Sequence, residues 1–167
     1  YNFSIAGVWG HDRGKFARGG AESVAFHYDA STMDRPLPRG HVWNMVYDPE
    51  APQAMEPSFS HDELWRRLER FLEAVVPVAA EAGVRLAAHP DDPPMPTLRG
   101  MPRLVYQPDL YQRLLDLVPN HANALEFCLG SLQEMSEGNI YDTIDHYGRQ
   151  NAIAYVHFRN VTGKVPD

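Results

Sequence analysis

The chain has 167 residues, 44% of them hydrophobic and 11% aromatic, which is enough for one soluble domain with a core of its own. Its formal charge is −7, and its basic residues form no cluster beyond the short stretch 65–70, so nucleic acid and anionic membranes are not expected as partners. A single cysteine excludes an intrachain disulfide and agrees with a cytoplasmic location. The sequence contains no run of roughly 20 apolar residues, the length that a membrane span needs.

The first third of the chain gives weak patterns. Residues 1–8 are apolar enough to predict a strand. Residues 10–20 are rich in glycine and charge, which indicates a mobile loop that could act as a lid over an anionic ligand or simply lie on the surface. Residues 42–47 predict a short segment that is either extended or helical.

From residue 60 onward, helix and strand patterns alternate. Ser60 and Glu63 form a capping box ahead of apolar residues that repeat at helical spacing until Gly83. The further elements are helices at 109–118 and 140–147, apolar strands at 84–88, 122–127 and 152–156, and loops at 90–100 and 130–138.

Alternating strands and helices imply parallel strands joined by right-handed crossovers. A whole (β/α)8 TIM barrel needs about 250 residues. We therefore predict an α/β fold that is a partial TIM barrel of about four βα units, with a small open sheet as the alternative. In the barrel interpretation, residues 1–167 form a single domain from the central part of a barrel that is truncated at both ends.

A residue able to bind a metal ion stands at the end of each of the last three predicted strands: His89, Cys128 and His157. The C-terminal ends of parallel strands face the functional site in such folds. Two imidazoles and a thiolate suit a borderline ion such as Mn, Fe or Zn. Taken singly, each histidine could be a hydrogen-bonded structural residue and the cysteine a small buried hydrophobe. Their common position in three successive units favours a metal site.

An acidic protein that binds an acidic ligand must supply local positive charge. Arg103 follows the proline-rich loop after His89, and Arg159 lies two residues beyond His157, so each could pair with a substrate carboxylate. The alternative for both is a solvated surface arginine. Asp92 lies in the same loop, where it could orient His89 or cap a turn.

Several stretches of the sequence resemble the mannonate dehydratase family. They are residues 82–94 with the string His-Pro-Asp-Asp-Pro-Pro, 101–103, 126–131 and 155–159. The resemblance implies a xylose-isomerase-like TIM barrel and a hydro-lyase that removes water from D-mannonate, giving 2-dehydro-3-deoxy-D-gluconate in hexuronate catabolism.

The same resemblance implies Mn²⁺ or Fe²⁺ bound by His89, Cys128 and His157, with an aspartate beyond residue 167 as the fourth ligand. It further implies a small sugar-acid substrate, contacted by Arg103, Arg159 and Asp92, and a homo-oligomeric enzyme. It leaves the general base unassigned.

Three other functions stay open. A sugar isomerase or epimerase on the same barrel would also use a divalent metal, but such enzymes favour carboxylate-rich sites, so Cys128 argues against it. A non-catalytic sugar-acid binding domain would hold metal without forming product. A closed structural zinc site would bind zinc tightly and would not respond to substrate.

Overall fold

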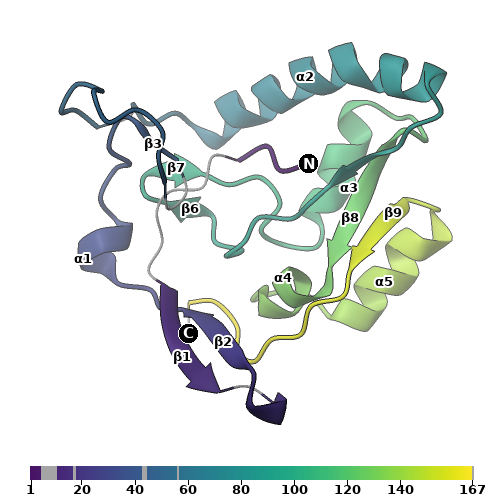
Figure 1. Ribbon diagram of the computed structural model, residues 1–167. Helices are drawn as coiled ribbons and strands as arrows, with labels where there is room; N and C mark the ends of the chain where they lie inside the picture. Colours follow the sequence, from purple (N-terminus) through teal and green to yellow (C-terminus); the bar gives the residue numbers. More distant parts are fainter. Residues whose placement is uncertain (5–10, 17, 43–44, 56, 167) are drawn as a thin grey trace. The chain divides into compact units, whose positions relative to one another are not determined.

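A computed structural model describes the chain except for residues 5–10, 17, 43–44, 56 and 167 (Figure 1). The contacts within the chain define two compact units. The first contains Tyr1–Ser4, Ser60–Pro96 and Pro102–Val165, and the second contains Ile5–Phe59, Thr97–Met101 and Pro166–Asp167. The single-domain boundary of 1–167 stays a prediction.

The first unit is built on a three-stranded parallel sheet in the order β5-β8-β9. These strands are β5 (Leu86–Ala88), β8 (Asn123–Cys128) and β9 (Ile153–His157). All three predicted strands are confirmed, and β8 and β9 each continue one residue further, onto Cys128 and His157. The α/β class and the parallel strand direction are confirmed with them.

A fourth strand was predicted at residues 1–8, of which 5–8 lie outside the described residues. The described part, 1–4, has no strand assignment, but its backbone runs beside β5. The Tyr1 nitrogen donates to the Ala87 carbonyl, and the His89 nitrogen donates to the Tyr1 carbonyl at 2.8 Å. Tyr1 therefore makes the backbone bonds of a neighbouring strand residue.

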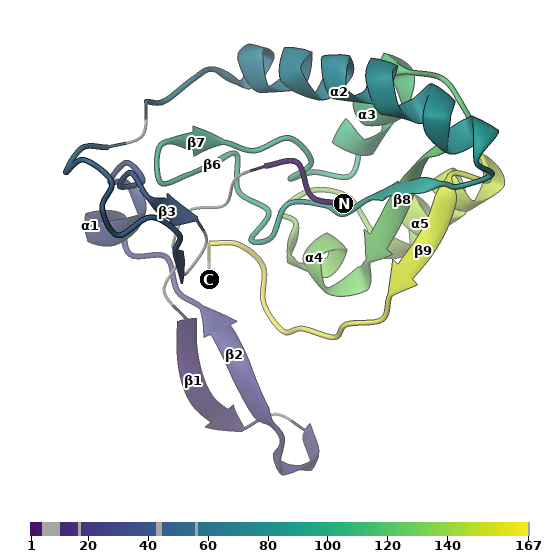
Figure 2. The ribbon, with the colours of Figure 1, turned by 45° about the horizontal axis from the view of Figure 1, so that its top comes forward.

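Four helices accompany this sheet (Figures 1 and 2). They are α2 (His61–Glu81), α3 (Leu110–Leu117), α4 (Leu129–Glu134) and α5 (Ile140–Arg149). The cap of α2 is confirmed, since the Ser60 side chain accepts a hydrogen bond from the Glu63 nitrogen at 3.2 Å. Its buried face is the predicted apolar stripe, with Leu68, Leu72 and Val76 fully buried. No helix in the described part of the chain is both long enough and apolar enough to cross a membrane.

Three aromatic rings join α3, β8 and α5. Tyr111 stacks on Phe127 with ring centroids 5.3 Å apart, and Tyr147 meets both rings edge-on. Both hydroxyl groups find backbone acceptors, because Tyr111 donates to the Glu126 carbonyl and Tyr147 donates to the Pro108 carbonyl. This packing fixes the C-terminal end of β8, where Cys128 stands.

The predicted loop at 130–138 is wrong in its first half, because Leu129–Glu134 form the helix α4 directly after Cys128. Glycine has a low helix propensity, so Gly130 made the sequence pattern of this segment favour a loop. Gly130, Ser131 and Leu132 are all buried, so tertiary packing decides the conformation here.

The second unit contains short elements. They are β1 (His11–Phe16), the 3-10 turn η1 (Arg18–Gly20), β2 (Glu22–Phe26), α1 (Ala30–Met33), β3 (His41–Val42), β4 (Met45–Val46) and β6 (Thr97–Leu98), which pairs with β7 (Met101–Pro102). The loop predicted at 10–20 is wrong over β1, which pairs with β2 in an antiparallel hairpin. Backbone hydrogen bonds sustain such a ladder without an apolar pattern, and Gly19 and Gly20 close it at φ +74° and +77°. Of the segment 42–47, residues 43–44 lie outside the described residues and 45–46 are extended.

The N-cap of α5 offers a test of the local fold. The Asn139 side chain accepts hydrogen bonds from the Tyr141 and Asp142 nitrogens at 2.8 and 3.4 Å. Asn139→Ala is expected to lower the free energy of unfolding by about 1 kcal/mol, because two helix donors lose their acceptor. Urea unfolding measures the loss. Asn160→Ala, at an exposed position, serves as the control with an expected change below about 0.5 kcal/mol. Equal losses in both variants would contradict the capping role.

Candidate metal centre

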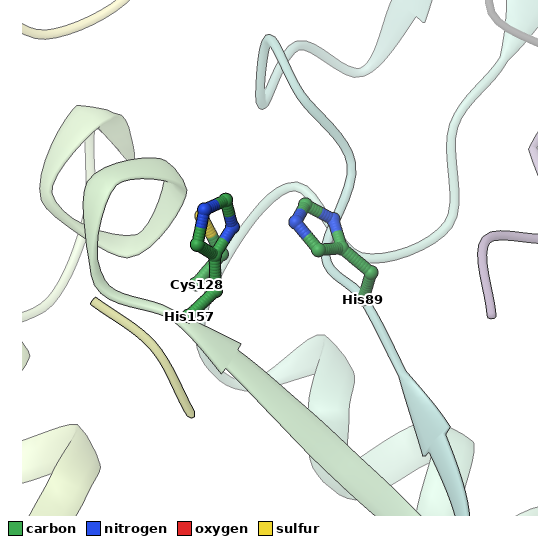
Figure 3. Close-up of side chains that lie close together, drawn as sticks. All are labelled: His89, Cys128 and His157. Carbon is green, nitrogen blue, oxygen red and sulfur yellow. The ribbon is translucent and has the colours of Figure 1, made fainter. Parts of the chain in front are cut away.

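The ends of the three parallel strands bring His89, Cys128 and His157 together. One donor atom from each residue lies within 4.8 Å of the other two. Cys128 and His157 are register partners on β8 and β9, and His89 directly follows β5. Figure 3 shows the His89 imidazole facing the Cys128 and His157 side chains. The three residues that the sequence indicates as ligands are therefore neighbours. Their donor atoms are close enough to one another to bind one shared ion.

The backbone fixes the orientation of the His89 ring. Its Nδ1 lies 2.6 Å from the Pro90 carbonyl oxygen, which can only accept, so we assign the proton to Nδ1. In the neutral ring the other nitrogen, Nε2, then carries no proton and can offer its lone pair to an ion. A histidine that donates its other N–H to a carbonyl is the usual arrangement for a metal ligand.

The three donors differ in exposure. Cys128 is fully buried, His89 is partly buried and His157 is exposed. Among the described residues, the group is therefore closed on the side of the sheet and open beside His157. An open side leaves room for further ligands or a substrate, which a closed structural zinc site would not provide.

The surroundings of Cys128 favour its thiolate form over the thiol. Burial raises the pKa of Cys128, but hydrogen bonds with His89 and with the Ser131 side chain and backbone outweigh it and bring that pKa down to about 6. Burial lowers the pKa of His89, while its bonds to Cys128 and to the Pro90 carbonyl outweigh this and leave that pKa raised. A thiolate is the form that binds metal ions, so Cys128 is ready to act as a ligand at neutral pH.

A second group of side chains lies beside these donors; we call it the arginine cluster and define it as Asp92, Ser131, Glu134 and Arg159. The Arg159 guanidinium donates from Nη1 to Asp92 Oδ2, and from Nη2 to Glu134 Oε1 at 2.6 Å. Ser131 Oγ lies 3.4 Å from Arg159 Nη1 and donates to Asp92 Oδ2 at 3.3 Å. The structure thus brings together two of the residues predicted to contact substrate, Asp92 and Arg159.

Ser131 and Glu134 were not identified from the sequence. They stand three residues apart on α4, and residues at this spacing share one helix face. The glycine and polar residues of 130–138 predict a loop, and a loop prediction carries no helical periodicity. Recognising a helix immediately after Cys128 would have pointed both side chains toward the site.

Arg103 has a different environment from Arg159. It is fully buried, and its Nε lies 2.9 Å from Oδ1 of the buried Asp91, an ion contact without hydrogen-bond alignment. Its Nη2 donates to the Asp92 backbone carbonyl at 3.1 Å. Arg103 is therefore a buried residue that supports the proline-rich loop through Asp92, and it is no surface arginine. Direct contact with substrate stays a prediction for Arg103, and its full burial argues against it.

The site carries excess negative charge. When they are ionised, the Cys128 thiolate and the carboxylates of Asp92 and Glu134 place three negative groups around the Arg159 guanidinium. Burial, together with the charges of Asp92 and Cys128, outweighs the effect of Arg159 and raises the pKa of Glu134 to about 7. The donor set and this charge both fit a divalent cation.

The raised pKa of Glu134 predicts a pH dependence of stability in the metal-free protein. Because the folded-state pKa of about 7 exceeds the ordinary value of 4.5, the stabilisation is complete below pH 4.5 and is lost as the pH rises through 7. Between pH 5 and 7 the free energy of unfolding should fall, relative to Glu134→Gln, by at most about 1.4 kcal/mol per pH unit. Urea unfolding at several pH values measures the difference, with Glu137→Gln as the exposed control. Parallel curves for the wild type and Glu134→Gln would contradict the raised pKa.

The fold and the site define an α/β protein with a parallel sheet that presents two histidines and a cysteine at neighbouring strand ends. The family model described as D-mannonate dehydratase (UxuA) matches residues 17–166. The chain therefore belongs to the D-mannonate dehydratase family.

Individual relatives agree with this assignment. The chain is 31% identical to mannonate dehydratase 2 of Halalkalibacterium halodurans over 99% of its own length and 50% of that protein. It is 39% identical to a mannonate dehydratase of Oceanobacillus iheyensis over 62% of the chain and 29% of that protein. A crystal structure of mannonate dehydratase from Streptococcus suis serotype 2 superposes with a TM-score of 0.74 at 27% identity, covering 98% of the chain and 45% of that structure. The chain thus spans about half the length of the first relative and less of the others.

Proposed function

We propose that the protein carrying this chain is a mannonate dehydratase, a hydro-lyase that removes water from D-mannonate to give 2-dehydro-3-deoxy-D-gluconate in hexuronate catabolism. The single observation that carries the proposal is the convergence of His89, Cys128 and His157 within 4.8 Å in a chain of this family. The curated relatives are named for the same activity.

The proposal includes Mn²⁺ or Fe²⁺ held by His89, Cys128 and His157. When bound, such an ion supplies Lewis acidity that stabilises negative charge developing on the substrate. In this proposal the chain supplies the three ligands and Arg159, whose positive charge would attract the carboxylate of a sugar acid. Asp92 and Ser131, next to Arg159, offer acceptor and donor oxygens for sugar hydroxyl groups.

The finer fold is also part of the proposal: the parallel sheet belongs to a (β/α)8 TIM barrel. The superposition on the Streptococcus suis enzyme supports it. So does β9, whose adjacent residues Tyr155 and Val156 are 58% and 46% exposed, as expected of a strand that further elements would cover. A homo-oligomer and a cytoplasmic location complete the proposal.

The test is turnover of D-mannonate by the intact protein under anaerobic conditions. We expect loss of D-mannonate and formation of the 2-keto-3-deoxy product with added Mn²⁺ or Fe²⁺, and neither in a chelated control. Bound metal without product from mannonate would contradict the assignment. It would favour a sugar isomerase or a sugar-acid binding domain, which product analysis with other sugars and ligand-binding measurements distinguish.

A further inference from the structure

The arginine cluster contains a residue to which no role has been given so far, Glu134. Its side chain is largely buried, 17% exposed, and it points at Arg159 from the C-terminal end of α4. Asp92 approaches the same guanidinium on its other amino group, Nη1. Arg159 is thus held through both terminal nitrogens by carboxylates from two different segments, the loop after β5 and the helix α4 after β8.

The stem of Arg159 is also constrained, by Gly130 in the first turn of α4. A Cβ atom on Gly130 would lie 2.7 Å from both Cγ and Cδ of Arg159, and 2.9 Å from its Nε. Real Cβ atoms do not approach other atoms so closely, so any side chain at position 130 would displace the arginine. The absence of a side chain at Gly130 therefore creates the space in which Arg159 lies.

The end of α4 that carries Glu134 is tied to the chain that follows Arg159. The Val165 nitrogen donates to the Glu134 carbonyl at 2.9 Å, and Lys164 Nζ donates to the Met135 carbonyl at 2.6 Å. The backbone of Glu134 is therefore anchored independently of its side chain. A carboxylate on an anchored backbone can hold a flexible arginine in one orientation at a lower cost in conformational entropy.

We propose that Glu134 is a positioning residue that, together with Gly130, holds the Arg159 guanidinium against Asp92 beside Cys128 and His157. Its carboxylate accepts the hydrogen bond that stops Arg159 from rotating. Glu134 does not need to touch the substrate for this role. The inference that this positioning serves substrate binding rests on the proposed function, whereas the positioning itself does not.

Arginine side-chain NMR tests the positioning directly in the intact protein. The Arg159 signals are identified by their loss in Arg159→Lys. We expect slow rotation of the Arg159 guanidinium in the wild type, fast rotation in Glu134→Ala, and slow rotation again in Glu134→Gln, whose amide oxygen still accepts. Glu137→Ala, at an exposed position three residues further on, should leave the Arg159 signals unchanged. Slow rotation in Glu134→Ala would overturn the proposal.

Gly130→Ala provides a second variant that leaves both carboxylates in place. It should displace Arg159 and therefore change the same signals, whether or not Glu134→Ala folds. Unchanged Arg159 signals in Gly130→Ala would show that the arginine is not held against α4, and they would overturn the proposal.

Kinetics with D-mannonate then test the purpose of the positioning. Glu134→Ala should raise KM by about tenfold, the equivalent of one charge-assisted hydrogen bond, with metal content and kcat close to the wild type. Glu134→Gln should restore KM. A fall in kcat and metal content at unchanged KM would indicate a merely structural role. If the wild type does not turn over mannonate, the proposed function fails, and the NMR result still decides the role of Glu134.

Discussion

If the proposed function holds, Cys128→Ser is expected to bind the metal ion far more weakly than the wild type and to lose nearly all turnover. The thiolate is one of three convergent donors, and a serine hydroxyl stays protonated at neutral pH, so it offers a much weaker ligand in the same place. Metal affinity should fall by at least about 100-fold, since loss of even an outer-shell partner typically costs 10- to 100-fold. Metal content after dialysis, and titration with Mn²⁺, measure the loss.

The control for this variant must separate ligation from packing, because Cys128 is fully buried. Cys128→Ala keeps a small apolar side chain and should retain the fold while losing the metal to the same extent. His146→Gln, an exposed histidine on α5, should bind metal as the wild type does. Wild-type metal affinity in both cysteine variants would contradict the ligand assignment and leave Cys128 as a small core residue.

Arg103→Met is expected to lower the free energy of unfolding by about 3–5 kcal/mol, because it leaves the buried carboxylate of Asp91 without its counter-charge. That carboxylate also accepts hydrogen bonds from the Leu104 and Val105 nitrogens at 2.7 and 2.8 Å, so it cannot turn away to solvent. The loss should spread to the site, since Arg103 also supports the Asp92 carbonyl. Urea unfolding measures the change.

An exposed ion pair provides the comparison for this second prediction. Arg149 and Asp145 are in contact on the surface of α5, with side chains 77% and 61% exposed. Arg149→Met should cost less than about 1 kcal/mol, because solvent screens the pair. Adding Asp91→Asn to Arg103→Met should recover part of the stability by removing the unpaired charge. Similar losses for the two arginine variants would contradict a special role for the buried pair.

The two arginines show that a sequence pattern does not predict the burial of a charged side chain or its ion-pair partner. Arg159 closely follows a predicted strand and Arg103 follows the proline-rich loop after another, and local patterns do not indicate that their environments differ. The structure buries Arg103 completely against Asp91 and leaves Arg159 partly accessible among Asp92, Ser131 and Glu134. Burial and partner choice depend on contacts between distant segments, which local periodicity does not contain.

The hairpin of β1 and β2 and the helix α4 show a second kind of limit. Both fall in stretches with glycine and polar residues, where propensity predicts a loop. Backbone pairing with a partner strand creates the hairpin, and burial of Gly130, Ser131 and Leu132 creates the helix. Glu134 was missed for this reason, since its position next to Arg159 exists only when α4 forms.

The sequence by itself determined the α/β class, the three parallel strands, the helices α2, α3 and α5 and the three candidate metal ligands. These follow from short-range patterns, because apolar strands covered on both faces and amphipathic helices have distinct periodicities. It also placed His89, Cys128 and His157 at one edge, because parallel strands end on the same side. Only the tertiary structure decided which polar residues surround that edge, because those contacts join loops up to 67 positions apart in the chain, as between Asp92 and Arg159.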